Sequence, residues 1–361
     1  MATLTPRKRV ELALYGSQGD RVPFTMYDNM IPQCQTEREL RNRGLCIVMR
    51  PSVFSIHRPN VKVYSEPVYQ DGHNMVRTYY ETPVGTVNAL SERVSFTSWL
   101  HEPMFKTPND YKVLLFMISD EVYKPNYEAF ALAQAHFGED AIFRASFGLE
   151  PLQTLISGNY LNTEAFCIEW MENRDEILKL YDAIVEKRRQ VYPIVAESPA
   201  SHANYGGNVV PEIIGKEVFR DYYVPHYNEA AEVMHKHGKL IGCHFDANCK
   251  AIADSIADTA LDYIEAFTPH PDTDMTLGEA RQAWPDKVLW LNFPSSVHLR
   301  PDDEIEETTI SLLDQLSNVS GIIMGITEDI PQDRWQKSCT AIMNGLDNHA
   351  QYHPELYARP K

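Results

Sequence analysis

Short apolar runs alternate with amphipathic stretches over the second half of the chain. The apolar runs predict strands at 141–146, 240–244, 263–267, 288–292 and 321–325. The amphipathic stretches predict helices at 164–173, 174–197, 217–237, 250–258, 276–284, 303–316 and 332–348. Continuous apolar strands followed by helices are typical of a parallel sheet covered on both faces. This many βα units in one chain favours closure, so we expect an α/β fold that is a single TIM-type (β/α)8 barrel spanning residues 1–361.

The pattern is less regular before residue 140. Thr5 is a suitable N-cap for a helix with Pro6 in its first turn, and Gly16 is a suitable stop. A strand should follow Asp20, and residues 82–87 read Thr-Pro-Val-Gly-Thr-Val, which indicates a hairpin. We therefore expect an irregular, insertion-rich excursion from the barrel over about 50–120.

Composition limits the partners and the compartment. A formal net charge of -17 disfavours nucleic acids and anionic membranes through repulsion. No apolar run approaches the ~18 residues of a membrane span, and the N-terminus lacks the apolar core of a secretory signal. We expect a cytoplasmic protein whose six scattered cysteines form no disulfide. The oligomeric state does not follow from the sequence.

Polar residues follow several predicted strands, and the active site of a TIM barrel lies at the carboxyl ends of its strands. His244 and Asp246 end one strand, Glu265 lies in the next, Asn292 ends another, and Glu328 follows the last. A catalytic zinc ion has three protein ligands and an open position, and imidazole nitrogen and carboxylate oxygen are suitable donors. The sequence therefore predicts a zinc site formed by His244, Glu265 and Glu328.

Simpler interpretations compete with each of these features. His244 taken alone is more readily explained as a hydrogen-bonded structural residue, and only three convergent candidates favour a metal. Cys243 should point away from His244 into the helix packing, because neighbouring strand side chains face opposite ways. Cys249 is a structural thiol rather than a ligand. Gly206-Gly207 lacks the spacing of a phosphate-binding loop, so a tight turn is the better interpretation.

Several segments together resemble the uroporphyrinogen decarboxylase superfamily. They are 4–10, 20–23, 82–86, 237–244, 264–269 and 274–280, and the resemblance is strongest from about 200 to 335. It implies a TIM barrel and one of two chemistries: cofactor-free porphyrinogen decarboxylation, or zinc-dependent methyl transfer to or from a corrinoid protein.

The decarboxylase branch fits this chain poorly. Its members carry an arginine-rich stretch near the N-terminus that holds the substrate carboxylates. Here no arginine follows Arg21 until Arg38. A substrate with many carboxylates needs several fixed cations, which this acidic chain does not offer there.

The resemblance to corrinoid-linked methyltransferases lies at the metal positions. Those relatives commonly have His-x-Cys and a second cysteine, where this chain has His244-Phe245-Asp246 and Glu328. Related methionine synthases place a glutamate near the position of Glu265. Asp246 is then either a fourth ligand or a group that orients a ligand.

A nitrogen and oxygen ligand set makes zinc a stronger Lewis acid than a sulfur-rich set and suits an oxygen substrate. The resemblance therefore implies a methyltransferase that demethylates a methyl ether, in particular a methoxylated aromatic. The acceptor would be the cob(I)alamin of a separate corrinoid protein docking transiently over the barrel mouth, because this chain has no corrinoid-ligand motif.

Other residues near the expected strand ends are candidates for substrate contact. Asp28 is expected to orient a substrate hydroxyl or assist proton transfer, and Asn292 to donate a hydrogen bond. The candidates for lining the pocket are Met26, Tyr27, Phe147, Tyr205, Asn208, Phe267 and Phe293. For at least half of these aromatic and apolar residues, ordinary barrel core is the better interpretation.

Three alternatives remain open at this stage. One is a decarboxylase of the porphyrinogen type. The second is a methyltransferase acting on a methylated amine or thiol. The third is a binding barrel that has lost catalysis and metal.

Overall fold

The computed structural model describes residues 4–94 and 97–357. Contacts divide the chain into two compact units. Unit 1 comprises the chain up to Pro51, Glu128–Ser146 and all residues from Pro199 onward. Unit 2 comprises Ser52–Tyr127 and Phe147–Ser198. All four residues that the sequence nominates for the metal site belong to unit 1.

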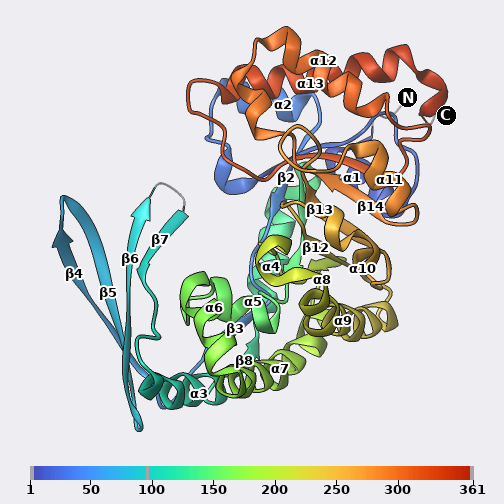
Figure 1. Cartoon of the computed structure of the whole chain (residues 1–361). Coiled ribbons are helices and arrows are strands. Elements are labelled where there is room, and N and C mark those ends of the chain that lie inside the picture. The colour runs from blue at the N-terminus through green and yellow to red at the C-terminus, as the bar shows by residue number, and fades with distance from the viewer. Residues whose placement is uncertain (1–3, 95–96, 358–361) are drawn as a thin grey trace. The chain divides into compact units, whose positions relative to one another are not determined.

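Unit 1 contains a ring of parallel strands. In spatial order they are β10 (Ala145–Ser146), β11 (His202–Asn204), β12 (Leu240–His244), β13 (Tyr263–Phe267), β14 (Val288–Leu291), β15 (Ile322–Ile326), β1 (Phe24–Tyr27), β2 (Leu45–Met49) and β9 (Ala141–Phe143). Only Arg144 separates β9 from β10, so the first and last members of this order are pieces of one run. The nine strands form a nearly closed barrel, and the predicted TIM-type fold is confirmed (Figure 1).

Helices accompany these strands through unit 1. They are α1 (Pro6–Leu14), α2 (Gln35–Asn42), α8 (Pro211–Tyr222), α9 (Val224–Lys236), α10 (Ala253–Ala257), α11 (Leu277–Ala283), α12 (Asp302–Leu313) and α13 (Trp335–Tyr352), while α4 (Tyr127–Phe137) begins at the boundary between the units. The Thr5 side chain accepts a hydrogen bond from the Lys8 N–H, and Gly16 has a φ of 64°, so the expected start and stop of α1 are confirmed. The single helix expected over 217–237 is wrong. Two helices meet at Tyr223, because Pro225 lacks a backbone donor and starts a new helix.

The barrel interior is formed by alternate residues of the strands. Tyr263, Trp290 and Ile323 belong to one buried cluster there, and the Trp290 Nε1–H donates to the Thr25 hydroxyl over 2.9 Å. Residues one position along each strand face the helices. Cys243 shows this, because its Sγ lies 3.5 Å from the Tyr227 hydroxyl of α9 as its position predicts. Position parity therefore decides which side chains reach the interior.

In the described part of unit 2 there are two antiparallel sheets and four α-helices. Strand β3 (Phe54–His57) pairs with β8 (Val122–Pro125), and the larger sheet runs β4 (Lys62–Gln70), β5 (His73–Thr82), β6 (Gly85–Val94) and β7 (Thr97–Glu102) (Figure 1). The helices are α3 (Tyr111–Ser119), α5 (Pro151–Ser157), α6 (Thr163–Glu172) and α7 (Arg174–Glu197).

Regular strands therefore replace the irregular stretch expected over about 50–120. The predicted hairpin is confirmed, with Thr82 paired to Gly85 across its turn. The longer strands escaped notice because most of β4 is exposed, so its residues show no alternation between polar and apolar faces.

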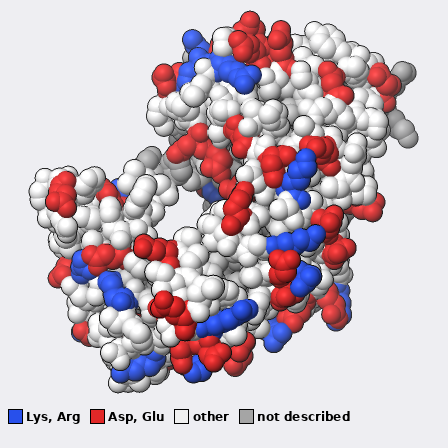
Figure 2. Space-filling model, in the orientation of Figure 1, with Lys and Arg blue, Asp and Glu red and all other residues white. Residues whose placement is uncertain are grey.

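Charge and hydropathy of the folded chain add two observations. Acidic and basic side chains are interspersed over the visible face of the molecule, so its negative charge is not gathered in one patch there (Figure 2). Every helix in the described part of the chain is too short or too polar to cross a membrane.

Candidate metal centre

Two neighbouring strands bring the first candidate ligands together. His244 is the last residue of β12, and its register partner on β13 is Glu265. Paired residues of parallel strands point to the same side of the sheet, so both side chains face the barrel interior at the carboxyl ends of the strands. The site thus lies where a barrel carries its chemistry.

Three donor groups converge on one point. Nitrogen or oxygen atoms of His244, Asp246 and Glu328 all lie within 4.8 Å of one another. The His244 Nε2 is 3.4 Å from the Asp246 Oδ2, which is long for a hydrogen bond. Two ligand atoms that each bind a tetrahedral zinc ion at about 2.0–2.1 Å lie about 3.3 Å apart, and the distance between Nε2 and Oδ2 is close to that value. The spacing fits a metal better than a direct contact.

Glu265 lies behind His244 rather than within this group. Its Oε2 is 2.6 Å from the His244 Nδ1, the ring nitrogen opposite the one that faces Asp246. The carboxylate is fully buried, and both its oxygens have protein partners. This differs from the expected ligand set because the strand register that pairs the two residues also brings their side chains into direct contact. Asp246, not Glu265, completes the triad of donors.

A buried polar network fixes Glu265. The Arg144 guanidinium forms an ion pair with its Oε1 at 2.8 Å and donates to the Tyr27 hydroxyl over 3.0 Å. Tyr27 donates to the same Oε1, and the Asn204 amide donates to Oε2 over 3.1 Å. A buried carboxylate with this many partners can hold an imidazole in one tautomer and orientation.

Burial and charge act in opposite directions on these groups. Burial disfavours a charge on Glu265, but Arg144 and His244 outweigh it and hold the carboxyl pKa well below its usual range. Burial likewise opposes a charge on His244, yet the carboxylates of Glu265 and Asp246 raise its pKa to about 10. Burial and then the neighbouring Asp246 raise the pKa of Glu328. The mouth carries crowded carboxylates that a bound cation would stabilise.

Gly207 supports His244 from the preceding loop. It has a φ of 148°, and a Cβ added there would lie 3.0 Å from the His244 Cβ. The backbone of this loop therefore packs closely against the histidine, and a side chain at 207 would displace it. This close approach, together with the positive φ of 79° at Gly206, explains the glycine pair.

The two residues predicted to act on substrate have different surroundings. Asn292 is buried, and it donates to the Thr268 hydroxyl over 3.2 Å and accepts from the Thr327 N–H over 2.9 Å. It positions the segment that leads into Glu328. Asp28 is partly exposed in the turn after β1, with one Oδ1 3.9 Å from the Arg50 guanidinium.

Three of the predicted pocket residues face away from the site. Met26 follows the opposite parity to Tyr27 along β1, and Tyr205 packs against Tyr227 of α9 with ring centroids 5.8 Å apart. Phe267 packs on Trp284 at 5.6 Å. The register shift between Glu265 and Phe267, where Ala266 has a φ of 60°, turns Phe267 outward. Met26, Tyr205 and Phe267 therefore pack in the core between strands and helices and do not line the pocket.

The remaining pocket candidates lie in varied places. Tyr27 contributes its hydroxyl to the Glu265 network, and the Arg50 guanidinium stacks 3.6 Å from its ring centroid. Asn208 is exposed with a φ of 57°, and Phe293 is buried against His298 at 5.2 Å. Phe147 belongs to unit 2, where its ring meets Tyr192 at 5.7 Å. The Tyr27 hydroxyl is within hydrogen-bond reach of both His244 and Glu265.

Sequence reasoning missed Arg144 and Asn204, the two polar residues that complete the network around Glu265. Arg144 had a visible signal, because it is the one charged residue in the apolar run 141–146. A charge inside a buried strand needs a buried partner. Asn204 had only its place before a glycine-rich loop, which gives no such signal.

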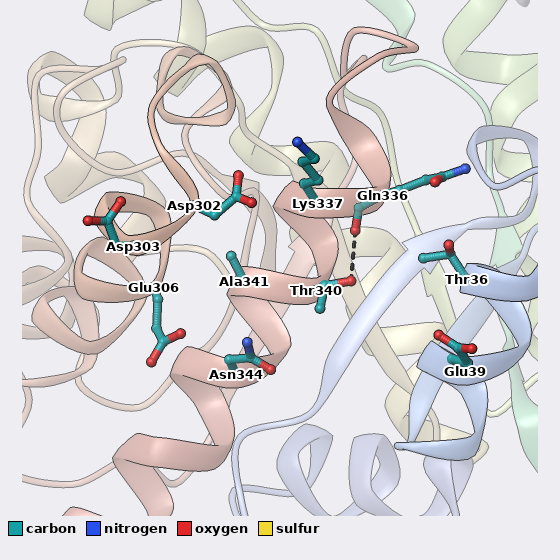
Figure 3. A pocket seen from close by; sticks show the side chains of 10 residues that line it. All are labelled: Thr36, Glu39, Asp302, Asp303, Glu306, Gln336, Lys337, Thr340, Ala341 and Asn344. Carbon is teal, nitrogen blue, oxygen red and sulfur yellow. Dashed lines mark hydrogen bonds between the residues drawn. The ribbon is translucent and has the colours of Figure 1, made fainter.

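A groove elsewhere in unit 1 contains none of the predicted residues. It has a volume of about 450 Å³, lies among α2, α12 and α13, and is lined by Thr36, Glu39, Asp302, Asp303, Glu306, Gln336, Lys337, Thr340, Ala341 and Asn344. Figure 3 shows carboxylates on both of its sides and a single lysine among the side chains drawn. The groove is open and acidic, without a histidine or cysteine.

Comparison with solved structures agrees with the fold. A methyltransferase from Methanosarcina mazei is similar over 96% of this chain and 99% of its own, with a TM-score of 0.56 and 12% identity. Two structures of the pneumococcal virulence factor StrH, an exo-β-D-N-acetylglucosaminidase, are more distant at 9% identity and TM-scores of 0.39 and 0.36, covering 92% and 91% of this chain and 84% and 86% of their own. No protein-family model and no curated protein sequence matches the chain. At these identities the likeness concerns the barrel, while the site rests on its own geometry.

Proposed function

We propose that this protein is a metal-dependent methyltransferase whose centre is the triad His244, Asp246 and Glu328. The observation that carries the proposal is the convergence of these donors, within 4.8 Å, at the carboxyl ends of barrel strands, with the far nitrogen of His244 held by buried Glu265. The methyltransferase from Methanosarcina mazei shares the barrel, which agrees with this proposal.

The donor set suits zinc in a catalytic rather than a structural site. One imidazole and two carboxylates leave a fourth position open, which is the arrangement of catalytic zinc centres. The carboxylate–histidine contact is the usual support for a metal-binding imidazole. Because the pKa of His244 is raised to about 10, a bound ion would displace the Nε2 proton and leave the proton on Nδ1 donated to Glu265.

The proposed substrate is a methyl ether, in particular a methoxylated aromatic. Zinc bound by this oxygen-rich set would supply Lewis acidity to the oxygen that departs when the C–O bond breaks. Both electrons of that bond stay with the oxygen, and the methyl group passes to the reduced corrinoid of a separate protein. Asp28 is proposed to orient a hydroxyl on the same substrate from the turn after β1.

The residues of the chain divide this work among themselves. His244, Asp246 and Glu328 hold the ion, and Glu265 fixes the ring plane of His244. Arg144 neutralises Glu265, so the buried carboxylate remains ionised and continues to accept from His244. Asn292 positions Thr327 and with it Glu328.

The same network argues against decarboxylation of a substrate with many carboxylates. Such a reaction needs cations that are free to bind the substrate. Arg144 is the cation nearest to the buried Glu265, and it is already committed to that carboxylate and to Tyr27.

The test mixes the zinc-loaded protein, reduced corrinoid protein and a panel of methoxyaromatics, and follows the spectral change from cob(I)alamin to methylcobalamin. We expect turnover with at least one phenyl methyl ether and its loss in His244→Ala and Glu328→Gln. The matched control is Asp329→Asn, which changes an adjacent exposed carboxylate outside the triad. Full activity in Glu328→Gln would contradict the proposed centre, and turnover of methylated amines alone would replace the ether as substrate.

A further inference from the structure

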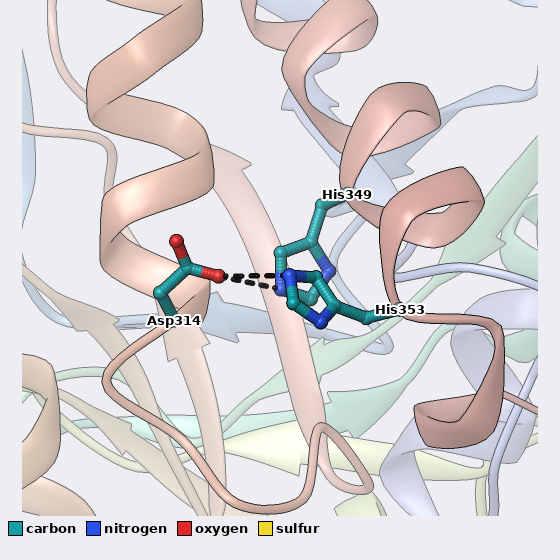
Figure 4. Close-up of side chains that lie close together, drawn as sticks. All are labelled: Asp314, His349 and His353. Carbon is teal, nitrogen blue, oxygen red and sulfur yellow. Dashed lines mark ion pairs between the residues drawn. The ribbon is translucent and has the colours of Figure 1, made fainter.

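A second group of metal-binding side chains lies at the ends of two packed helices, apart from the barrel strands. Asp314 is the C-cap of α12, His349 lies in the last turn of α13, and His353 is the C-cap of α13. Figure 4 shows both imidazoles turned toward the Asp314 carboxylate. Donor atoms of the three lie within 4.8 Å of one another.

The distances match metal coordination better than hydrogen bonding. The Asp314 Oδ1 is 3.5 Å from the His349 Nε2 and 3.3 Å from the His353 Nε2. Both separations exceed the usual N–H···O range and lie within about 0.2 Å of the edge, about 3.3 Å long, of a tetrahedron of ligands around zinc. One oxygen and two nitrogens thus occupy three corners of a plausible coordination shell.

His349 supplies an independent indication. Its side chain is fully buried, and its Nε2, the atom that faces Asp314, has no hydrogen-bond partner among the described residues. A buried polar atom without a partner costs stability, so it calls for a ligand. The opposite nitrogen, Nδ1, is 2.6 Å from the Tyr357 hydroxyl, which fixes the ring.

The surroundings favour a cation. The carboxyl ends of both α12 and α13 meet here, and helix carboxyl ends carry partial negative charge. Glu355 lies 3.5 Å from the Nδ1 of His353 and can orient that ring.

Packing holds the ligands at a fixed separation. A Cβ at Gly345 would lie 2.7 Å from the Thr309 Cβ, so the glycine allows α13 to approach α12 closely. Asn348 also donates to Glu306 over 2.6 Å across the same pair of helices. The two helices are therefore locked together immediately before the three ligands.

We propose that Asp314, His349 and His353 bind a divalent first-row transition-metal ion of the zinc class. Asp314 and His353 are partly exposed, so water completes the coordination. Helices that follow parallel strands run back toward the strand amino ends, which places this ion at the end of the barrel opposite the mouth. The ion joins the ends of α12 and α13 and stabilises the fold.

The test measures bound zinc per chain by mass spectrometry after equilibration with zinc and removal of loosely held metal on a chelating resin. Relative to the unsubstituted protein, His353→Ala and Asp314→Asn should each lose about one ion. They should also lose the rise in Tm that zinc produces. His235→Ala is the matched control, because His235 forms an exposed pair with Asp262 at 2.9 Å without a third donor.

Zinc binding at the helix ends can be tested independently of zinc binding at the barrel mouth. His244→Ala should keep the ion at the helix ends, and His244→Ala combined with His353→Ala should bind none. Because His353 is partly exposed, its replacement should leave the far-UV circular dichroism and the metal-free Tm unchanged. Unchanged zinc content in both His353→Ala and Asp314→Asn would overturn the proposal.

Discussion

The barrel mouth and the ends of α12 and α13 present similar donors in different electrostatic settings. At the mouth, the ring nitrogen of His244 that faces away from the triad contacts an ionised carboxylate, which is itself neutralised by Arg144. At the helix ends, the corresponding nitrogen of His349 contacts a neutral hydroxyl of Tyr357. The mouth therefore resembles a catalytic metal site, and the helix ends resemble a structural metal site.

The difference reflects the elements that carry each group. Strand register places His244 beside Glu265, and three further polar side chains surround that carboxylate inside the barrel. The helix-end group needs only the close approach of two helices. A network of buried charges is costly to assemble, so the network around Glu265 agrees with a chemical role for the mouth better than with a purely stabilising one.

The largest effect should come from Arg144→Met. It leaves Glu265 buried without its cation, so we expect the free energy of unfolding to fall by about 3–5 kcal/mol. Urea unfolding monitored by circular dichroism measures this. The control, Arg50→Met, removes a partly exposed guanidinium that stacks on Tyr27 and should cost at most about 1 kcal/mol. Equal losses in the two variants would show that the Arg144–Glu265 pair is not a special feature of the mouth.

Sequence reasoning was sufficient for the fold, although it missed Arg144. The alternation of apolar strands and amphipathic helices predicted the barrel, because that pattern has few other ways to bury its apolar surface. The place of His244, Glu265 and Glu328 at or after strand ends predicted that they would converge, with Asp246 as a fourth ligand or an orienting group. Neither inference needed side-chain detail.

Register and bulges account for what the sequence could not show. The sequence does not show which residues of two strands are paired, so the direct contact between Glu265 and His244 could not be foreseen and Glu265 was assigned to the metal. The register shift at Ala266 turns the Phe267 side chain away from the barrel interior. The residue pattern does not show this shift, so Phe267 was assigned to the pocket. Strand β4 of the unit 2 sheet was missed because most of its residues are exposed and show no alternation of polar and apolar positions.

Second in size, His244→Ala should abolish zinc binding at the mouth. Loss of an orienting partner typically lowers metal affinity about 10- to 100-fold, and loss of a ligand should exceed that, above about 2.7 kcal/mol. Competition with a chromophoric chelator measures the affinity. His57→Ala removes an exposed histidine that belongs to neither donor group, so it serves as the control and should bind zinc normally. Retention of both ions by His244→Ala would remove the distinction between the two regions.

The pH dependence of stability is the third test, and it concerns the barrel interior beneath the mouth. Burial and the nearby Arg144 lower the pKa of His202 to about 3, so this histidine is neutral in the fold. The unfolded chain binds a proton there below about pH 6.5, so acid favours unfolding. Between about pH 6.5 and 5, His202 should reduce the free energy of unfolding by up to about 1.4 kcal/mol per pH unit.

His202→Gln should flatten that slope relative to the unsubstituted protein, as measured by urea unfolding at several pH values. His136→Gln removes an exposed histidine and should leave the slope unchanged. An identical slope in His202→Gln and the unsubstituted protein would contradict a neutral, buried His202.

The smallest effect should come from Tyr357→Phe at the helix ends. It removes the hydroxyl that contacts the His349 Nδ1, so zinc affinity there should fall by about tenfold. Tyr352→Phe changes an exposed tyrosine at the end of α13, the helix that carries His349, and should have no effect. A loss at the mouth instead of the helix ends would mean that the two groups are not independent.

Diffraction from zinc-soaked crystals, with anomalous data collected on both sides of the zinc absorption edge, tests the central claim most directly. The account predicts an anomalous peak at the barrel mouth bonded to the Nε2 of His244 and to carboxylate oxygens of Asp246 and Glu328, with Glu265 still on Nδ1. A mouth without a peak, or a peak coordinated by Glu265, would contradict it.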